Sequence, residues 1–516
     1  MELVGDGGRL DAAALAGVPA HVARPGFDRT ALGIGIVHLG LGAFARAHLA
    51  AVNDAALRVG ADLDWGICGV SLRHADTRDA LAPQDGLYTL ALRDADGGGA
   101  RRQRVGIIGC LLETLVAPED PQAVLARIAA PGTRIVSITV TEKGYCHDPA
   151  SGRLNLAHPD VAYDLANPAA PRGVLGFLVY GLQRRRAAGL PPLTMMSLDN
   201  LPANGRLLRA LVLTFAAQVD AGLADWIASA CAFPCSMVDR IVPRTTDADR
   251  QEVAATLGVR DAWPVVAEPY LEWVVEDRFA AGRPDWTAGA ARFVDDAAPF
   301  ETLKLRMVNG AHSALAYLSV MAGWTSVDEA MAQPGMRRFL NALMHLEIEP
   351  TLPPLPGLDL AEYRHGLLQR FANPALRHQT RQIAMDGSQK LPQRLLNTVR
   401  DRLAADAPIP DLALAVAGWL LFLRGSDQAG RAYEIQDPMA EALAQRYAMA
   451  ERAARQAGEG PAAMLAWAGV LTGFEPVFGG LGQEPRFVRA VAQAAQSLRS
   501  LGVAGTLSAR FPVPSG

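Results

Sequence analysis

Short apolar runs alternate with amphipathic stretches of helical length in the first part of the chain. The runs cover residues 33–39, 65–72, 105–111, 133–140 and 193–198, and stretches such as residues 118–129 separate them. Strands of about four to eight residues that alternate with helices are typical of a mostly parallel sheet with helices on both faces. The pattern therefore predicts a doubly wound α/β domain at the start of the chain.

Strand-like patterns become rare after residue 205, where long alanine- and leucine-rich helical patterns take over. Residues 336–348 and 487–501 are examples, and residues 412–423 form an uninterrupted apolar run. That run is shorter than the roughly 20 residues that cross a bilayer, so it predicts a buried helix. We expect a mostly α-helical second domain at residues 296–516, after a first domain at residues 1–295.

A glycine-rich turn lies between the first apolar run and the amphipathic stretch that follows it. Its spacing is G-x-G-x-x-A, with Gly40, Gly42 and Ala45 at the defined positions. The first glycine allows a tight turn, and the second lets the backbone approach a pyrophosphate at a helix N-terminus. The small third residue permits close packing of helix and strand. The place of the motif in the first βαβ unit favours a dinucleotide site over an ordinary turn.

The end of the second apolar run bears on the choice between NAD and NADP. An acidic residue that binds the ribose hydroxyls is expected near this position. The sequence instead continues Ser71-Leu72-Arg73-His74, and Asp76 comes only later. Arg73 is suited to a 2′-phosphate. We expect NAD as the cofactor, with NADP as the open alternative.

The segment of residues 304–312 carries an amine, an amide and an imidazole. At about 100° per residue on an α-helix, Asn309 lies roughly 140° from Lys304, and His312 lies between them at about 80°. Alcohol oxidation needs a base for the hydroxyl proton and donors for the negative charge that develops on the oxygen. Burial of Lys304 would favour its uncharged, basic form. The alternative is a helix with scattered polar residues.

Composition narrows the range of partners. The formal net charge is −4 and half of the residues are hydrophobic, so we expect neither a nucleic-acid surface nor a disordered chain. The five cysteines show no spacing typical of structural zinc, and no metal site is predicted. The N-terminus lacks the apolar segment of a signal peptide, which predicts a cytoplasmic protein with no membrane anchor.

Several longer motifs together resemble the mannitol dehydrogenase family of long-chain polyol dehydrogenases, which includes mannitol 2-dehydrogenase and fructuronate reductase (D-mannonate oxidoreductase). They are found at residues 35–48, 137–146, 196–205, 233–243, 283–286, 304–313 and 382–394. The resemblance implies a Rossmann-type N-terminal domain, a helical C-terminal domain and an active site in the cleft between them. It also implies a metal-independent, NAD(P)-dependent oxidoreductase that interconverts a linear polyol or hexonate and its 2-keto form.

The resemblance further assigns roles to individual side chains. Lys304 would be the general base in oxidation and the general acid in reduction. Asn309 and Asn200 would hold the reacting oxygen, and His312 would orient the substrate or the lysine. Glu301 would pass a proton between Lys304 and solvent.

Asp239 and Lys390 would contact substrate hydroxyls or a carboxylate in the same scheme. Structural alternatives stay open for four residues: Asn200 as a cap of its loop, Asp239 as an ion-pair partner of Arg240, Glu301 as an acidic residue near a helix N-terminus, and His312 as a core histidine. The resemblance also places the glycine turn and the end of the fourth apolar run against the cofactor. The predicted cofactor-binding residues are Gly40, Gly42, Ala43, Phe44, Arg73, Thr141 and Glu142.

The identity of the substrate stays open within this family. A hexonate carries a carboxylate, for which Lys390, Arg377 and Arg381 are candidate cations. Gln379 and Arg381 stand where the hexonate-specific branch is expected to have an arginine and a tryptophan. Mannitol, sorbitol and arabinitol are therefore alternative substrates.

Two other functional classes share the glycine turn: a non-catalytic dinucleotide-binding regulator and an S-adenosylmethionine-dependent methyltransferase. Neither class needs the combination of Lys304, Asn309 and His312, which is present here. The expected partners are a small polyol or sugar acid and the cofactor. A monomer is compatible with the sequence.

Overall fold

The computed structural model describes residues 8–95, 101–148, 151–355 and 357–512. These residues form two compact units along the chain. The first unit runs to Glu301, and the second begins at Thr302. Each unit buries its own hydrophobic clusters and therefore has a separate core.

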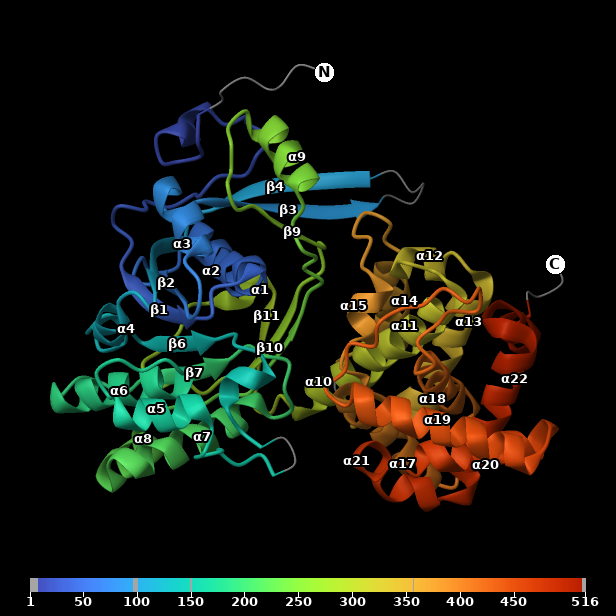
Figure 1. The fold of residues 1–516 in the computed structure, drawn as a ribbon. Helices are drawn as coiled ribbons and strands as arrows, with labels where there is room; N and C mark the ends of the chain where they lie inside the picture. The colour runs from blue at the N-terminus through green and yellow to red at the C-terminus, as the bar shows by residue number, and fades with distance from the viewer. Residues whose placement is uncertain (1–7, 96–100, 149–150, 356, 513–516) are drawn as a thin grey trace. The chain divides into compact units, whose positions relative to one another are not determined.

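A five-stranded parallel sheet forms the centre of the first unit. Its order is β5-β2-β1-β6-β7, and every neighbouring pair is parallel. From β1 the chain adds β2 and β5 on one side and then β6 and β7 on the other, so the order reverses between β1 and β6. Figure 1 labels β1, β2, β6 and β7 in this sheet. The α/β fold predicted from the apolar runs is confirmed. The strands are β1 (Ile34–Leu39), β2 (Gly66–Ser71), β5 (Leu111–Val116), β6 (Ile135–Ile138) and β7 (Thr194–Ser197).

Successive side chains of each strand enter different cores. Val37 and Leu39 of β1 pack in one cluster with residues of α4, α6, α7 and α8, whereas Ile36 packs in the cluster that contains residues of α1 and α2. Figure 1 shows α6, α7 and α8 together on one side of β6 and β7. The helices of this unit are α1 (Ala43–Ala47), α2 (Leu49–Arg58), α3 (Asp76–Leu81), α4 (Pro121–Ile128), α5 (Pro159–Ala166), α6 (Val174–Ala187), α7 (Asn204–Val219), α8 (Ala221–Ala230) and α9 (Asp247–Leu257).

The apolar run at residues 105–111 does not form a strand of the parallel sheet, so this part of the prediction was wrong. Most of the run belongs to β4 (Arg101–Ile108), which pairs antiparallel with β3 (Tyr88–Ala95) in a second sheet that β9 (Val265–Ala267) completes. The strand beside β2 is β5, which begins at Leu111. Because apolar residues continue from β4 into β5, hydrophobicity alone does not separate the two strands.

Strands also occur after residue 205, contrary to the expectation from the sequence. A third sheet has the order β11-β10-β8 and consists of β8 (Ser236–Asp239), β10 (Glu272–Glu276) and β11 (Ala291–Val294). These strands are short, and two of them end in buried acidic residues, Asp239 and Glu276. Their polar ends obscure the apolar pattern that a buried strand is expected to show.

The described residues of the second unit form helices and connecting segments, with no strand among them. Two helices at its centre, α11 and α18, are buried along nearly their whole length, which confirms the buried helix predicted at residues 412–423. The helices are α10 (Ala298–Leu303, which crosses the boundary), α11 (Gly310–Ala322), α12 (Val327–Met331), α13 (Pro334–Ala342), α14 (Leu360–Phe371), α15 (Thr380–Ala384), α16 (Gly387–Leu391), α17 (Asn397–Ala404), α18 (Pro410–Phe422), α19 (Ala440–Ala457), α20 (Gly460–Thr472), α21 (Glu475–Phe478) and α22 (Pro485–Arg510).

Among the described residues, no single helix is both long and apolar enough to span a membrane. One pair bent by 74°, Gly460–Thr472 with Glu475–Gln483, meets the length and composition criteria together.

Three stretches of the second unit are π-helical rather than α-helical: Lys304–Asn309, Leu343–Ile348 and Pro392–Leu396. In a π-helix each backbone hydrogen bond joins residues that are five apart in the sequence, instead of four apart as in an α-helix. Such stretches are rare and often lie at functional sites. Residues five apart therefore lie closer around the axis than on an α-helix. The predicted angle of about 140° between Lys304 and Asn309 assumed an α-helix and is wrong for this reason.

Candidate functional site

A cavity of about 1010 Å³ lies in the first unit at the carboxyl ends of β1, β2 and β6. Ligands of doubly wound folds bind outside the carboxyl ends of the strands, where the strand order reverses. Four predicted cofactor-binding residues line the cavity: Gly40, Gly42, Arg73 and Thr141. The other three, Ala43, Phe44 and Glu142, are neighbours in sequence but do not belong to its lining.

The glycine turn is held in place by its backbone. Gly40 has a φ of +96°, and a Cβ atom there would lie 2.1 Å from the carbonyl oxygen of Thr139. The N–H of Gly40 donates to the oxygen of Val70 at 2.8 Å, and the Thr139 hydroxyl donates to the oxygen of Gly40 at 2.8 Å. Gly42 is exposed, and its nearest neighbour would be 3.9 Å from an added Cβ. Gly40 therefore makes the turn, and Gly42 leaves space above it.

His38 supports this turn from inside the sheet, a role that the sequence analysis missed. Its Nδ1 lies 2.9 Å from the hydroxyl of Ser137, and its Nε2 lies 2.9 Å from the hydroxyl of Thr139. Burial lowers the pKa of His38 to about 4, so the imidazole is neutral near pH 7. A histidine in an otherwise apolar strand was the signal that could have identified it.

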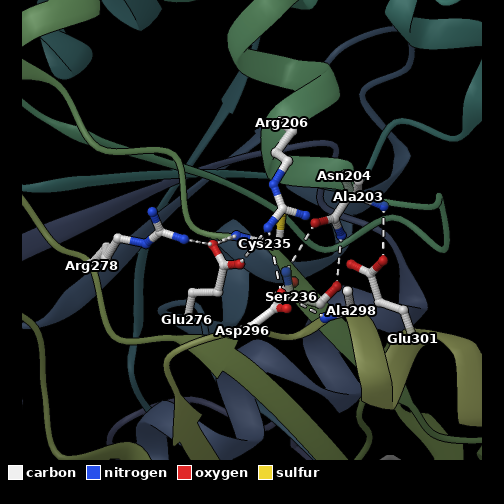
Figure 2. Close-up of polar contacts among 10 residues, drawn as sticks. All are labelled: Ala203, Asn204, Arg206, Cys235, Ser236, Glu276, Arg278, Asp296, Ala298 and Glu301. Atoms are coloured by element: carbon white, nitrogen blue, oxygen red, sulfur yellow. Dashed lines mark hydrogen bonds and ion pairs between the residues drawn. The ribbon is translucent and has the colours of Figure 1, made fainter. Parts of the chain in front are cut away.

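The loop between β7 and α7 carries Asn200, which is exposed. The neighbouring Asn204 is fully buried, and its amide nitrogen donates to the carbonyl oxygens of Ser197, Asp199 and Ser236 at 3.2, 3.0 and 2.8 Å. Its Oδ1 accepts the N–H of Ser236 at 2.9 Å (Figure 2). Asn204 thus fixes both ends of the loop to β8, which leaves the Asn200 amide at the surface of the unit.

Glu301 lies at the end of the first unit and is 9% exposed. Its Oε2 accepts the backbone N–H of Ala203 at 2.8 Å, in the same loop that carries Asn200 (Figure 2). Its Oε1 is buried and has no hydrogen-bond partner among the described atoms. Burial raises the pKa of Glu301, and the bond from Ala203 opposes this shift. The carboxyl group is therefore suited to gain and lose a proton closer to neutral pH than an ordinary glutamate.

Figure 2 also shows a second acidic group below this loop, Glu276 at the end of β10. Its Oε2 accepts the N–H of Cys235 at 3.0 Å and a bond from Arg278 at 2.9 Å, and its Oε1 lies 3.4 Å from Arg206. Arg206 also reaches Asp296 at 3.4 Å, beside the start of α10. These bonds tie the segment before Glu301 to the sheet.

Asp239 is the last residue of β8 and is buried. It pairs across the sheet with Glu272. The next residue, Arg240, donates to the carbonyl oxygens of Glu268 at 2.9 Å and Ala47 at 2.5 Å. Arg240 therefore has a structural role in joining β8 to the segments around it, and Asp239 stands at the carboxyl end of the strand.

Lys304, Asn309 and His312 belong to the second unit and are 7%, 7% and 8% exposed. Lys304 and Asn309 are the first and last residues of the π-helical stretch, and His312 is in the first turn of α11. The Asn309 amide nitrogen and the His312 Nε2 are buried with no hydrogen-bond partner among the described atoms. The segment thus offers two polar groups that a ligand can satisfy, next to a buried amine.

His312 stacks on Phe371, with ring centroids 3.9 Å apart and planes 12° apart. Burial lowers its pKa well below the usual value, and the positive charges nearby lower it further. The imidazole is therefore neutral. The groups that act on it include Lys304, Arg370 and Arg394, which places positive charge around the segment.

Arg394 is a second residue that the sequence analysis missed. A Cβ at Gly310 would lie 2.8 Å from the Arg394 carbonyl oxygen, so the glycine lets α11 meet the π-helical stretch 392–396 backbone to backbone. The Arg394 side chain donates to the Ser313 hydroxyl at 3.2 Å. Arg394 lies four residues after Lys390, at the end of the motif 382–394, and this position could have identified it from the sequence.

Lys390 is half-buried, with Asp386 4.0 Å from its ammonium nitrogen. Burial, followed by the charge of Arg394, lowers its pKa to about 8. Arg381 is exposed, and its guanidinium lies 5.4 Å from the ring centroid of Tyr433. Lys390 therefore lies beside Arg394, whereas Arg381 contacts the aromatic ring of Tyr433.

Cys146, His158 and Asp160 place one potential ligand atom each within 4.8 Å of one another. His158 caps α5, and its Nδ1 accepts the N–H of Asp160 at 3.2 Å. Burial and the nearby Asp160 raise the pKa of Cys146 to about 11, which keeps the thiol protonated near pH 7. The capping role accounts for the proximity of His158 and Asp160, and the expectation of a metal-independent protein stays a prediction.

Comparison with known proteins identifies both parts of the chain. The family model for the mannitol dehydrogenase Rossmann domain matches residues 34–288, and that for the mannitol dehydrogenase C-terminal domain matches residues 296–499. D-mannonate oxidoreductase of Escherichia coli K12 is 46% identical over 422 residues, which are 81% of this chain and 86% of that protein. Mannitol 2-dehydrogenase of Pyrenophora tritici-repentis is 41% identical over 489 residues, 93% of this chain and 82% of that protein.

Two solved structures are similar over nearly the whole chain. The ternary complex of Pseudomonas fluorescens mannitol 2-dehydrogenase with NAD and D-mannitol has a TM-score of 0.84 at 39% identity, and the match covers 98% of this chain and 100% of that one. A D-sorbitol dehydrogenase in substrate-free form has a TM-score of 0.85 at 32% identity and covers 97% and 100%. The chain belongs to the mannitol dehydrogenase family.

Proposed function

We propose that the protein is an NAD-dependent oxidoreductase that interconverts the C2 alcohol of a linear polyol or hexonate and the corresponding 2-ketone. The observation that carries the proposal is the buried group of Lys304, Asn309 and His312. Two of its polar atoms have no hydrogen-bond partner within the described part of the chain, which also has a dinucleotide-type cavity. The names of the relatives agree with it, since they include a mannitol 2-dehydrogenase and a D-mannonate oxidoreductase.

The cavity of the first unit fits NAD in size and chemistry. Its volume is at the upper end of the range of about 300–1,000 Å³ for small-molecule sites. The open space at Gly42 admits a pyrophosphate to the backbone, and Arg73 stands at the end of β2, where the adenosine ribose is expected. Bound NAD would accept the hydride from C2 of the substrate.

In this proposal, Lys304 in its uncharged form takes the proton of the C2 hydroxyl as the hydride leaves. In the reverse direction its ammonium returns the proton to the oxygen. General base catalysis of this kind contributes roughly 10²–10⁴-fold. The scheme requires that the substrate held by the second unit meet the cofactor held by the first.

The Asn309 amide nitrogen, which is buried without a partner among the described atoms, donates to the oxygen on which negative charge develops. The exposed Asn200 amide is the proposed second donor. Each such donor lowers the barrier by at most about 3–4 kcal/mol. Since His312 is neutral, it acts as a hydrogen-bonding group that orients the substrate rather than as a source of charge.

Glu301 is the proposed proton carrier between Lys304 and solvent. It precedes Lys304 by three residues, its pKa is raised by burial, and one of its oxygens has no partner among the described atoms. Its bond to Ala203 gives it a structural role in addition.

The charges around His312 favour a hexonate as the preferred substrate. After burial, Arg370 and Arg394 both lower the pKa of His312, and Lys390 lies beside Arg394. Guanidinium and ammonium groups in such surroundings are suited to bind a carboxylate. Neutral mannitol is the second candidate because the solved relative at 39% identity is a complex with D-mannitol.

The test compares the purified wild type with Lys304→Ala on D-mannonate, D-mannitol, D-sorbitol and D-arabinitol, each with NAD and NADP. Formation of the reduced nicotinamide is followed by absorbance. We expect the wild type to oxidise D-mannonate fastest, with NAD. The variant should lose roughly 10²–10⁴-fold in kcat and keep its affinity for NAD, and added methylamine should restore part of the rate.

The pH profile adds a second readout. Oxidation by the wild type should rise with pH through a single group, and this limb should be absent in Lys304→Ala. A variant that keeps more than about a tenth of the rate would contradict the role of the lysine, because general base catalysis contributes far more. NAD binding without turnover of any of the four substrates would favour a non-catalytic regulator.

A further inference from the structure

Thr141 has an unusual backbone conformation in the wall of the dinucleotide cavity. Its φ is 61° and its ψ is 169°, a region that is almost restricted to glycine. A threonine in this region is strained by its Cβ and persists only where the surrounding structure holds it. The residue lies just beyond β6, between Val140 and the short 3₁₀-helix Glu142–Tyr145.

The carboxylate of Asp199 holds this backbone. Its Oδ1 accepts the N–H of Thr141 at 2.9 Å, and its Oδ2 accepts the N–H of Val140 at 3.1 Å. Asp199 is buried and follows β7, the strand next to β6. One side chain therefore satisfies two consecutive N–H groups at the point where the sheet ladder has ended.

Tyr145 and Ser197 keep the carboxylate in place. The Tyr145 hydroxyl donates to Asp199 Oδ2 at 2.8 Å and lies 2.5 Å from the Ser197 hydroxyl, which accepts the N–H of Asp199 at 3.2 Å. The Tyr145 hydroxyl, the Ser197 hydroxyl and Asp199 thus form a closed ring of hydrogen bonds in which every donor meets an acceptor. The partners described for the Asp199 side chain are all neutral donors, and none is a cation.

The position of Thr141 indicates which part of a dinucleotide it meets. In a doubly wound domain the pyrophosphate lies at the glycine turn after β1, and the adenosine ribose lies at the end of β2. The strand order here is β2-β1-β6, so the end of β6 is on the opposite side of the turn. Thr139, Val140 and Thr141 line this side of the cavity.

We propose that Asp199 is a positioning residue that, with Tyr145, holds the backbone of Val140 and Thr141 in the shape that receives the nicotinamide half of the dinucleotide. This inference rests on the proposed function, since it takes NAD as the ligand. It predicts that loss of the carboxylate weakens contacts to one half of NAD and spares the other half.

The experiment measures the affinity of the whole protein for NAD and for ADP-ribose, which lacks the nicotinamide. Asp199→Asn keeps the shape of the side chain but replaces one acceptor by a donor that faces an N–H. We expect the affinity for NAD to fall roughly 10- to 100-fold, as for loss of a hydrogen bond to a charged group. The affinity for ADP-ribose should change by less than about twofold by the same reasoning.

A rescue variant separates positioning from general damage. In Asp199→Asn the added change Thr141→Gly should restore most of the NAD affinity, because glycine adopts this conformation without strain. Asp225→Asn is the matched control: it removes the same charge from an exposed residue of α8 that does not line the cavity. This control should leave the affinities for both ligands close to those of the wild type.

Three outcomes would overturn the inference: equal loss of affinity for both ligands, no loss for either, or no rescue by Thr141→Gly. If Asp199→Asn does not fold, as judged by thermal unfolding, the same comparison is made with Tyr145→Phe, which removes only the hydroxyl that donates to Asp199. Failure of the wild type to bind NAD would contradict the proposed function instead, so the two failures are distinguishable.

Discussion

In the turn after β1 the candidate functional atoms belong to the backbone, whereas in the segment from Lys304 to His312 they belong to side chains. The turn is exposed at Gly42 and depends on the absence of side-chain atoms. The segment in the second unit is buried and depends on an amine, an amide and an imidazole. The two regions should therefore respond in opposite ways to substitution.

This difference has a physical basis in how each region is held. The turn is fixed mainly through its own backbone atoms, such as the Gly40 N–H that donates to Val70, with one side-chain bond from the Thr139 hydroxyl to the Gly40 oxygen. In the buried segment the Asn309 amide nitrogen and the His312 Nε2 have no hydrogen-bond partner among the described atoms, and buried polar groups of this kind cost free energy. A site made of backbone atoms adds little to this free-energy cost. A site made of buried polar side chains lowers the stability of the fold but provides the groups that the reaction needs.

The largest expected effect is that of Gly40→Ala. A Cβ at this position would lie 2.1 Å from the Thr139 carbonyl oxygen, and the φ of +96° is unfavourable for alanine. We expect the free energy of unfolding to fall by at least about 3 kcal/mol and NAD binding to be lost. Thermal unfolding and a titration with NAD measure both effects.

Gly42→Ala is the matched control, since its added Cβ would be 3.9 Å from the nearest atom. It should keep the unfolding free energy within about 0.5 kcal/mol of the wild type. Its affinity for NAD should still fall, roughly tenfold, because the methyl group enters the space proposed for the pyrophosphate. Unchanged NAD affinity in both variants would place the cofactor elsewhere.

The second prediction concerns Asn309, where function should depend on a side-chain atom and not on shape. Asn309→Ala should lower kcat by roughly 10²–10³-fold, the usual cost of one donor to a developing oxyanion. The protein should be at least as stable as the wild type, because the buried amide nitrogen has no partner among the described atoms. Steady-state kinetics and thermal unfolding test the two parts.

Gln389→Ala, which removes an exposed amide from α16, is the control for this variant. Its kcat should match that of the wild type. An Asn309→Ala variant with full activity would show that the buried segment acts through its shape, as the glycine turn does, and the contrast between the two regions would fail.

The same contrast explains how much of the site was predictable. Glycine identity reports directly on backbone conformation, so the role of Gly40 could be inferred from spacing alone and agrees with its positive φ. A mostly parallel sheet could likewise be predicted from the strand-length apolar runs, four of which form its strands β1, β2, β6 and β7. The run at residues 105–111 misled because two strands of different sheets adjoin there with apolar residues throughout.

The side-chain region was less predictable in its geometry. The chemistry of residues 304, 309 and 312 could be predicted from their types. The π-helical backbone that sets the relative directions of their side chains has no recognised signature in the sequence. Arg394 and Asn204 were missed because their importance comes from packing between distant segments. His38 was more accessible to prediction, as a polar residue in a buried strand.

The smallest expected effect tests the cost of a side-chain site in terms of stability. Lys390 has a pKa of about 8 in the folded protein, lowered mainly by burial, against an ordinary value of 10.5. Below pH 8 the folded protein must keep a charge that burial disfavours. Between about pH 8 and 10.5 the unfolded chain binds this proton and the folded protein does not, so stability rises with pH across this window.

Lys390→Met removes the charge and keeps much of the side-chain volume. It should therefore be more stable than the wild type at pH 7, by at most about 3 kcal/mol, and the advantage should shrink as the pH approaches 10.5. Each kcal/mol corresponds to a rise in Tm of about 2–4 °C for a unit of this size. Lys143→Met, at an exposed lysine of the first unit, is the control and should leave the free energy of unfolding at pH 7 close to that of the wild type. A Lys390→Met variant that is less stable at pH 7 would mean that the contact with Asp386 outweighs the cost of burying the charge. The buried lysine would then not lower the stability of the fold.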